Sequence, residues 1–190
     1  MKDDITISEH NDIATILRLS SEADLYKGTQ ITRWSTRNYI KSENDCEHQN
    51  IVTQIVIIIC EYFPICLETY RNALGLASIH DMFEYVEGGM GDIPHHIKEK
   101  SPEIRKIVED HELETIIANK SFGKAYERFY KDELAKKIVN LADTIDVLLY
   151  IDREFKLGNQ DPDFKEIRPK ALQRAINYGY ELIRQIKESK

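Results

Sequence analysis

A histidine–aspartate pair, His80-Asp81, is the most informative dipeptide of the chain for chemistry. A neutral imidazole and an ionised carboxylate at neighbouring positions can both ligate one divalent cation. His48 lies 32 residues before this pair, and Asp143 lies 62 residues after it. Two imidazoles and two carboxylates suit Mn, Co, Fe or Zn better than an ion that prefers oxygen alone, and Mg is retained as an alternative.

The surroundings of His48 and Asp143 strengthen this interpretation. His48 begins a segment that is otherwise apolar, which predicts that it is buried. Asp143 stands within the apolar run 138–149, where a charge is costly unless it is paired or bound to a metal. Each also has an ordinary explanation, as a histidine at a helix start and as a paired or exposed carboxylate. Asp146 is a nearby carboxylate that could be mistaken for Asp143.

A further carboxylate, Glu84, is expected to accompany the metal ligands. It follows His80 by four residues and Asp81 by three. On a helix these spacings put side chains on one face, one turn apart. Glu84 is therefore expected to stand beside a metal rather than to ligate it.

Helices must position these groups, because helical signals run through nearly the whole chain. The predicted helices span 8–26, 47–63, 64–85, 101–118, 123–156 and 165–188. The β-branched run 51–59 could alone be a buried strand, but its helical neighbours favour a helix buried almost all round. A glycine-rich break covers 87–94. We expect one all-α domain over 1–190 with six or seven helices.

Length and composition set outer limits on the function. The chain has 190 residues, 42% of them hydrophobic, with eight glycines and five prolines, which excludes a disordered or collagen-like chain. A net charge of −7 argues against a protein that coats nucleic-acid polymers. Three cysteines without a Cys-x-x-Cys spacing predict reduced thiols. With no signal peptide or membrane span evident, we expect a cytoplasmic protein.

The ordered set His48, His80-Asp81, Asp143 resembles the H…HD…D pattern of HD-domain phosphohydrolases, an all-α superfamily of metal-dependent phosphoesterases. A closer resemblance is to the bacterial 5′-deoxynucleotidases. It rests on Arg-Trp at 33–34, Arg-Asn at 37–38, Glu-Asn-x-x-Glu-His at 43–48, Gly-Asp-Ile-Pro at 91–94 and Leu-Ala-Asp at 141–143. It covers about residues 15–155, and the last helix lies beyond it.

The resemblance implies a role for each matching residue. His48, His80, Asp81 and Asp143 would hold the metal. Glu84 and Asp92 would flank the phosphate and position or activate the attacking water. Arg33 would bind phosphate oxygens, and Trp34 would border the sugar and favour a 2′-deoxy substrate.

Two departures from the pattern put the substrate in question more than the reaction class. The spacing between the Arg-Trp and Arg-Asn pairs is one residue shorter than in the family. His95-His96 stands where the nucleotidases favour a threonine.

The expected reaction is hydrolysis of a deoxyribonucleoside 5′-monophosphate to deoxynucleoside and phosphate. The related phage dATP triphosphohydrolases suggest an alternative, release of triphosphate from a dNTP. A second alternative, from another class, is a non-catalytic nucleotide-binding module. The resemblance also implies a homodimer or larger homo-oligomer. An apolar stripe on the last helix could either pair subunits or complete the core; its residues are Leu172, Ile176, Tyr180 and Ile183.

Overall fold

The computed structural model describes residues 15, 27–85 and 101–188. The described chain is helical apart from one short hairpin, which confirms the expected all-α fold. Its helices are η1 (Lys27–Gln30), α2 (Asp45–Tyr62), α3 (Leu67–Ala77), η2 (Met82–Glu84), α5 (Pro102–Ala118), α6 (Gly123–Tyr130), α7 (Glu133–Lys156) and α8 (Pro162–Glu188). The antiparallel hairpin pairs β1 (Thr32–Arg33) with β2 (Glu43–Asn44). The predicted helix 8–26 and the glycine-rich break 87–94 lie outside the described residues, apart from Thr15, which is helical.

The β-branched run 51–59 is helical rather than a buried strand, because it lies within α2. A capping box begins it: the Asn44 side chain accepts from the Glu47 N–H, and the Glu47 carboxylate accepts from the Asn44 N–H. The expectation that this helix is buried almost all round was wrong. Ile57 and Ile58 are 40% and 66% exposed, because only one face packs on the core.

Helix α3 is shorter than the predicted helix 64–85. It begins at Leu67 and ends at Ala77, so His80-Asp81 lies in the turn that follows rather than within a helix. The chain tightens there into turns of the 3₁₀ kind, in which the Ile79 N–H bonds to the Leu76 carbonyl and the Met82 N–H to the Ile79 carbonyl. This tighter path buries the side chains of both Ile79 and Met82.

The predicted helix 123–156 is two helices, because Asp132 starts a new one. Its carboxylate accepts hydrogen bonds from the N–H groups of Leu134 and Ala135, which makes it the N-cap of α7. The side chain thus satisfies backbone donors that a continuous helix would have bonded to carbonyls of the preceding turn. The short α6 and the long α7 can then take different directions.

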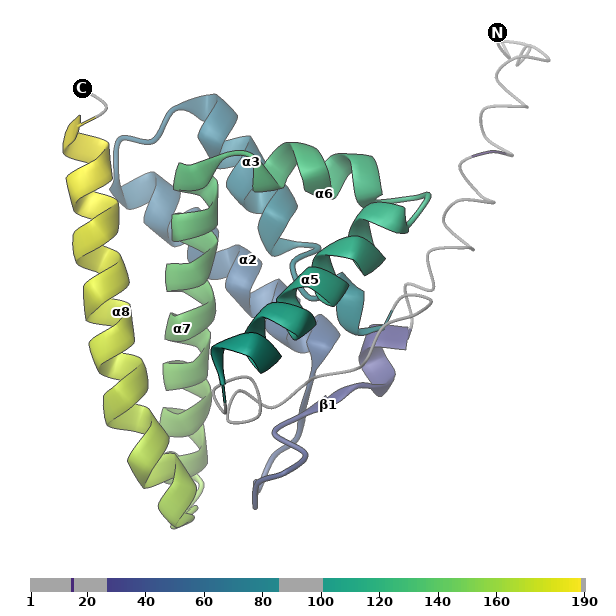
Figure 1. Cartoon of the computed structure of the whole chain (residues 1–190). Helices are drawn as coiled ribbons and strands as arrows, with labels where there is room; N and C mark the ends of the chain where they lie inside the picture. Colours follow the sequence, from purple (N-terminus) through teal and green to yellow (C-terminus); the bar gives the residue numbers. More distant parts are fainter. Residues whose placement is uncertain (1–14, 16–26, 86–100, 189–190) are drawn as a thin grey trace, which may run out of the picture.

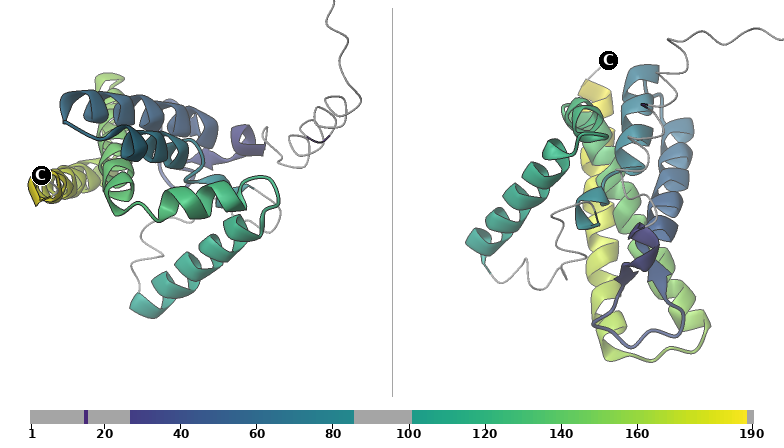
Figure 2. Two further views of the ribbon diagram at one scale, coloured as in Figure 1. Left: turned by 90° about the horizontal axis from the view of Figure 1, so that it is seen from above. Right: turned by 90° about the vertical axis from the view of Figure 1, so that its right-hand side faces the viewer.

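The core lies where α2, α3 and α7 meet. Val52, Val56, Ala73, Ile138 and Ala142 are fully buried there. Helix α8 runs along α7, as Figures 1 and 2 show, and joins the core through Leu182 and Ile186. Among the described residues, no helix has both the length and the apolarity that crossing a membrane requires.

The apolar stripe of α8 does not complete the core of its own chain. Leu172, Ile176 and Tyr180 are 43%, 42% and 71% exposed. The face of α8 that is buried instead carries Phe164, Ala171, Leu182 and Ile186. Pairing of subunits through this stripe stays a prediction.

Candidate metal and phosphate site

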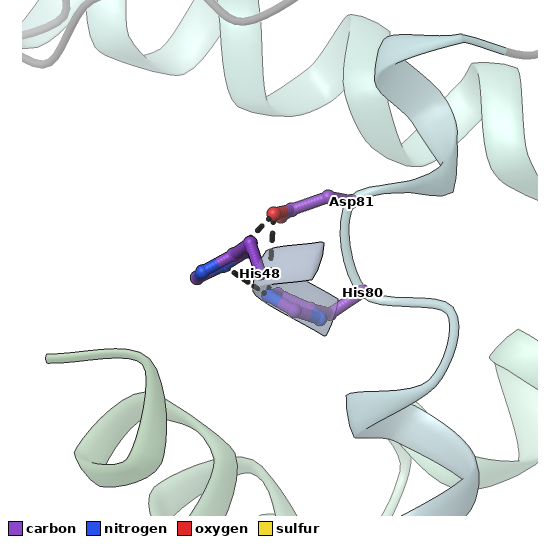
Figure 3. A group of neighbouring side chains, drawn as sticks. All are labelled: His48, His80 and Asp81. Atoms are coloured by element: carbon purple, nitrogen blue, oxygen red, sulfur yellow. Dashed lines mark hydrogen bonds and ion pairs between the residues drawn. The ribbon is translucent and has the colours of Figure 1, made fainter. Parts of the chain in front are cut away.

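Three elements bring the predicted metal ligands together. His48 lies in the first turn of α2, His80 and Asp81 lie in the turn after α3, and Asp143 lies on α7. His48 Nε2 is 3.2 Å from both His80 Nε2 and Asp81 Oδ2, and these last two atoms are 3.3 Å apart. Figure 3 shows this triangle, with the two rings and the carboxylate pointing toward one another. Asp143 Oδ1 meets it at His48 Nε2, 3.2 Å away, with its side chain 42% exposed.

The hydrogen bonds of the two rings show that the triangle suits a cation. His80 Nδ1 lies 2.8 Å from the carbonyl oxygen of Ala77, which only accepts, so Nδ1 carries the hydrogen. His48 Nδ1 donates in the same way to the Asp146 carboxylate at 2.6 Å. In the neutral form of each ring, Nε2 would therefore present a lone pair toward the other ring and toward carboxylates. Only a proton or a metal ion between these acceptors relieves the repulsion.

The spacing of the three atoms also fits a metal. Tetrahedral metal sites have ligand bonds of about 2.0–2.1 Å to nitrogen and oxygen, which places neighbouring ligand atoms about 3.3 Å apart. The observed sides of 3.2, 3.2 and 3.3 Å match one face of such a tetrahedron. His48, His80 and Asp81 could therefore hold a divalent metal.

The charges of the metal-free site point the same way. Burial and the Arg33 charge lower the pKa of His48, but hydrogen bonds to Asp143, Asp146 and Asp81 outweigh them and raise it well above its ordinary value. Burial raises the pKa of Asp81, yet the nearby His80, His48 and Arg33 hold it far below its ordinary value. Both shifts show that the surroundings of His48 favour a positive charge there, which either a proton or a metal ion could supply.

The predicted metal ligands His48, His80, Asp81 and Asp143 are called the metal group below. The β1–β2 hairpin brings the predicted phosphate ligand, Arg33, to this group. Arg33 Nη1 donates to Asp81 Oδ2 at 3.0 Å, and Arg33 Nε lies 3.9 Å from Glu43 Oε2, its partner across the hairpin. The Arg33 side chain is only 14% exposed. A guanidinium beside the metal ligands can meet the oxygens of a phosphate bound there.

A second group of ligand types, Glu43, His48 and Asp146, lies deeper and is wholly buried. It shares His48 with the first group but uses the other ring nitrogen. That nitrogen already donates to Asp146, so a proton rather than a metal occupies this side of the ring. Burial, together with the Asp146 charge, raises the pKa of Glu43 despite the opposing charges of Arg33 and His48. The Nε2 side of His48 is therefore the side that could hold a metal.

Trp34 follows Arg33 and packs against α7 and α8. Its ring stacks on Tyr150, with centroids 4.9 Å apart and planes 5° from parallel, and it meets Phe164 edge-on at 5.5 Å. Its backbone has φ of 61°, a conformation in which a bulky residue is strained. Such strain persists only where the surroundings impose it, and it recurs at binding sites.

The remaining predicted residues are only partly placed. Glu84 lies in η2, three residues after Asp81, and is 7% exposed, with its N–H bonded to the Asp81 carbonyl. Asp92 lies outside the described residues, as do His95 and His96. Glu84 does not share one face of an α-helix with His80 and Asp81, as predicted, because α3 ends at Ala77 and this segment is not α-helical.

Four buried acids have no role predicted from the sequence: Glu43, Asp45, Asp146 and Glu154. Asp146 was weighed only as a competitor of Asp143, although a spacing of three on a helix places both on one face. Glu154 is fully buried in the last turns of α7. Only the fold shows what Asp146 and Glu154 face.

Comparison with known proteins agrees with this geometry. The family model described as 5′-deoxynucleotidase YfbR-like matches residues 23–184. No curated protein matches the chain.

Several solved structures share the fold at low sequence identity. An HD-domain phosphohydrolase from Listeria innocua has a TM-score of 0.67 at 24% identity, covering 90% of this chain and 84% of its own. The cyanophage S-2L HD phosphohydrolase DatZ, bound to dA and one catalytic Zn²⁺ ion, has a TM-score of 0.62 at 15% identity, covering 88% and 96%. A protein from Pyrococcus horikoshii OT3 has a TM-score of 0.63 at 18% identity, covering 92% and 99%.

The fold, the histidine–aspartate group and the family match thus agree with one another. The chain has the fold of the HD-domain phosphohydrolases, and it belongs to the family of hydrolases described as 5′-deoxynucleotidase YfbR-like.

Proposed function

We propose that this protein hydrolyses deoxyribonucleoside 5′-monophosphates to deoxynucleoside and phosphate, with a divalent metal held by His48, His80, Asp81 and Asp143. The observation that carries the proposal is the convergence of two imidazole lone pairs and the Asp81 carboxylate, with the Arg33 guanidinium 3.0 Å from that carboxylate. A cation and an arginine side by side suit a phosphate better than any neutral substrate.

The metal, when bound, neutralises charge on the phosphate oxygens and makes a water more acidic. Arg33 would bind phosphate oxygens and orient the group. A carboxylate accepts one proton of the water as its oxygen attacks phosphorus, and Glu84 and Asp92 are the candidates. The bond between phosphorus and O5′ breaks, and O5′ leaves as a hydroxyl after gaining the proton that the carboxylate took from the water.

Trp34 supports a preference for deoxy substrates in this proposal. Its ring is held by Tyr150 and Phe164 directly after the phosphate-binding Arg33, so it would border the sugar next to the phosphate. A rigid ring at that place leaves little room for a 2′-hydroxyl.

Chromatographic product analysis tests the proposal. Metal-stripped protein is resupplied with Mn, Co, Zn or Mg and given matched deoxy- and ribonucleoside mono- and triphosphates. Deoxynucleoside plus phosphate from deoxy monophosphates is the expected result, with Asp81→Ala inactive as the control. Deoxynucleoside plus triphosphate from a dNTP would replace the proposal with a triphosphohydrolase. No turnover with any metal, and no difference between Asp81→Ala and the natural chain, would favour a nucleotide-binding module.

A further inference from the structure

The segment between β1 and β2, residues 34–42, carries Trp34 and follows Arg33, and it needs support from outside. Its two strands pair over only two residues each. An isolated two-stranded hairpin is at best marginally stable in water. Some other part of the molecule must therefore hold this segment, which we call the 34–42 loop.

We propose that Glu154 is a positioning residue that clamps the 34–42 loop and so sets Arg33 and Trp34 for the substrate. Glu154 is fully buried, and both oxygens of its carboxylate accept hydrogen bonds. Oε2 accepts from the Ile40 N–H at 2.6 Å, and Oε1 accepts from the Lys41 N–H at 3.0 Å. A buried carboxylate is costly unless hydrogen bonds replace its water, and here the loop backbone replaces it.

Residues around the α7–α8 turn complete the clamp. The Asn159 amide donates to Glu154 Oε2 at 2.8 Å and to the Asn38 carbonyl at 2.7 Å. The Tyr150 hydroxyl donates to the Lys41 carbonyl at 3.0 Å. Figure 2 shows the hairpin beside the turn between α7 and α8. Gly158, with φ of 94°, supplies the left-handed conformation that ends α7 just before Asn159.

One face of α7 connects this clamp to the metal group. Asp143, Asp146, Tyr150 and Glu154 follow one another at spacings of three, four and four residues, which puts them along one stripe of a helix. The stripe is about 16 Å long at 1.5 Å per residue. Its first residues contact His48, Tyr150 stacks on Trp34, and Glu154 holds the loop. The single helix α7 thus fixes the distance between the metal group and the 34–42 loop.

The test compares Glu154→Gln with Asp152→Asn, a matched change on the same helix. Asp152 is 39% exposed and pairs with Arg168 of α8, away from the loop. The amide introduced by Glu154→Gln has one acceptor oxygen where the loop needs two, and its NH₂ would face an N–H donor. Kinetics with deoxyadenosine 5′-monophosphate rest on the proposed function, so a second readout is needed. Trp34 is the single tryptophan of the chain, and its fluorescence reports on the loop directly.

In Glu154→Gln, we expect KM to rise about ten-fold with kcat changed less than about two-fold, because the metal group is intact while the substrate contacts shift. Discrimination between deoxy and ribo substrates should also weaken. Acrylamide should quench Trp34 more strongly, and zinc content should match the natural chain. Asp152→Asn should change none of these. If Glu154→Gln fails to fold, Tyr150→Phe replaces it. This variant keeps the ring that stacks on Trp34 but loses the hydrogen bond to the Lys41 carbonyl. We expect smaller changes in the same direction in KM, in substrate discrimination and in Trp34 quenching.

Two results would overturn the clamp. The first is a Glu154→Gln variant in which both the quenching of Trp34 and KM are the same as in the natural chain. The second is a variant in which only kcat falls and the quenching of Trp34 does not change. If the natural chain turns over no nucleotide, the proposed function fails, and increased Trp34 quenching in Glu154→Gln alone still supports the clamp.

Discussion

Asp146 Oδ2 lies 2.6 Å from Nδ1 of His48, and both side chains are almost completely buried. This bond fixes the hydrogen of the ring on Nδ1 and leaves Nε2 to face His80 and Asp81. Carboxylates that bond metal-binding histidines in this way orient the ring and make it a stronger ligand.

Replacing Asp146 with alanine should weaken metal binding without abolishing it. Removal of such a supporting carboxylate typically costs ten- to a hundred-fold in metal affinity or activity, roughly the effect expected here. Competition with a chromogenic chelator measures the zinc affinity. Asp152→Ala, on the same helix but facing Arg168, is the control and should bind as the natural chain does. An equal loss in both variants would contradict a specific role for Asp146.

Replacing Asp81 with asparagine should remove metal and activity together. The change keeps the shape of the side chain but deletes the charge that faces His48, His80 and Arg33. We expect at least about a hundred-fold loss of zinc affinity, since a direct ligand matters at least as much as its supporting carboxylate. Metal content after dialysis, read by atomic emission, checks this. A variant that retains one zinc per chain would show that the metal lies elsewhere.

Metal and proton should compete for His48. The folded, metal-free chain has a His48 pKa above the ordinary 6.5, so its proton stabilises the fold below about 6.5 and is lost as the pH rises through the folded pKa. A metal needs the unprotonated ring, so added zinc should raise Tm most above that pKa and least below 6.5. Thermal unfolding with and without zinc across this range measures the effect. A zinc effect independent of pH would contradict His48 as a ligand.

Two glycines in helices should respond oppositely to alanine. A Cβ at Gly75 of α3 would collide with the ring of Phe129 on α6, so Gly75→Ala should destabilise the fold by about 1–3 kcal/mol. A Cβ at Gly179 of α8 meets nothing, so Gly179→Ala should stabilise it by about 0.5–1 kcal/mol. Urea unfolding of both variants gives the two free energies. Stabilisation by Gly75→Ala would show that α3 and α6 do not pack this closely.

Much of the site could be predicted from the sequence because its residues carry their own constraints. An imidazole beside a carboxylate can ligate one cation, and a charge within an apolar helix is costly unless it is paired or bound to a metal, so together these residues point to a metal before any fold is known. The start of α5 after Ser101 follows from local hydrogen bonding, and the predicted helix 101–118 agrees with it. The capping box at Asn44 is equally local, but the predicted helix 47–63 began two residues after the observed start of α2.

The tertiary structure decided what depends on contacts between distant segments. Helix α3 stops at Ala77 because tighter turns bury both Ile79 and Met82, a balance that local spacing does not contain. Asp146 meets His48 across 98 residues, and Glu154 meets the loop across more than 110, so neither bond leaves a local signal. The residue types and order of the metal group are local chemistry, whereas its supporting bonds arise only when α2, α7 and the hairpin pack together.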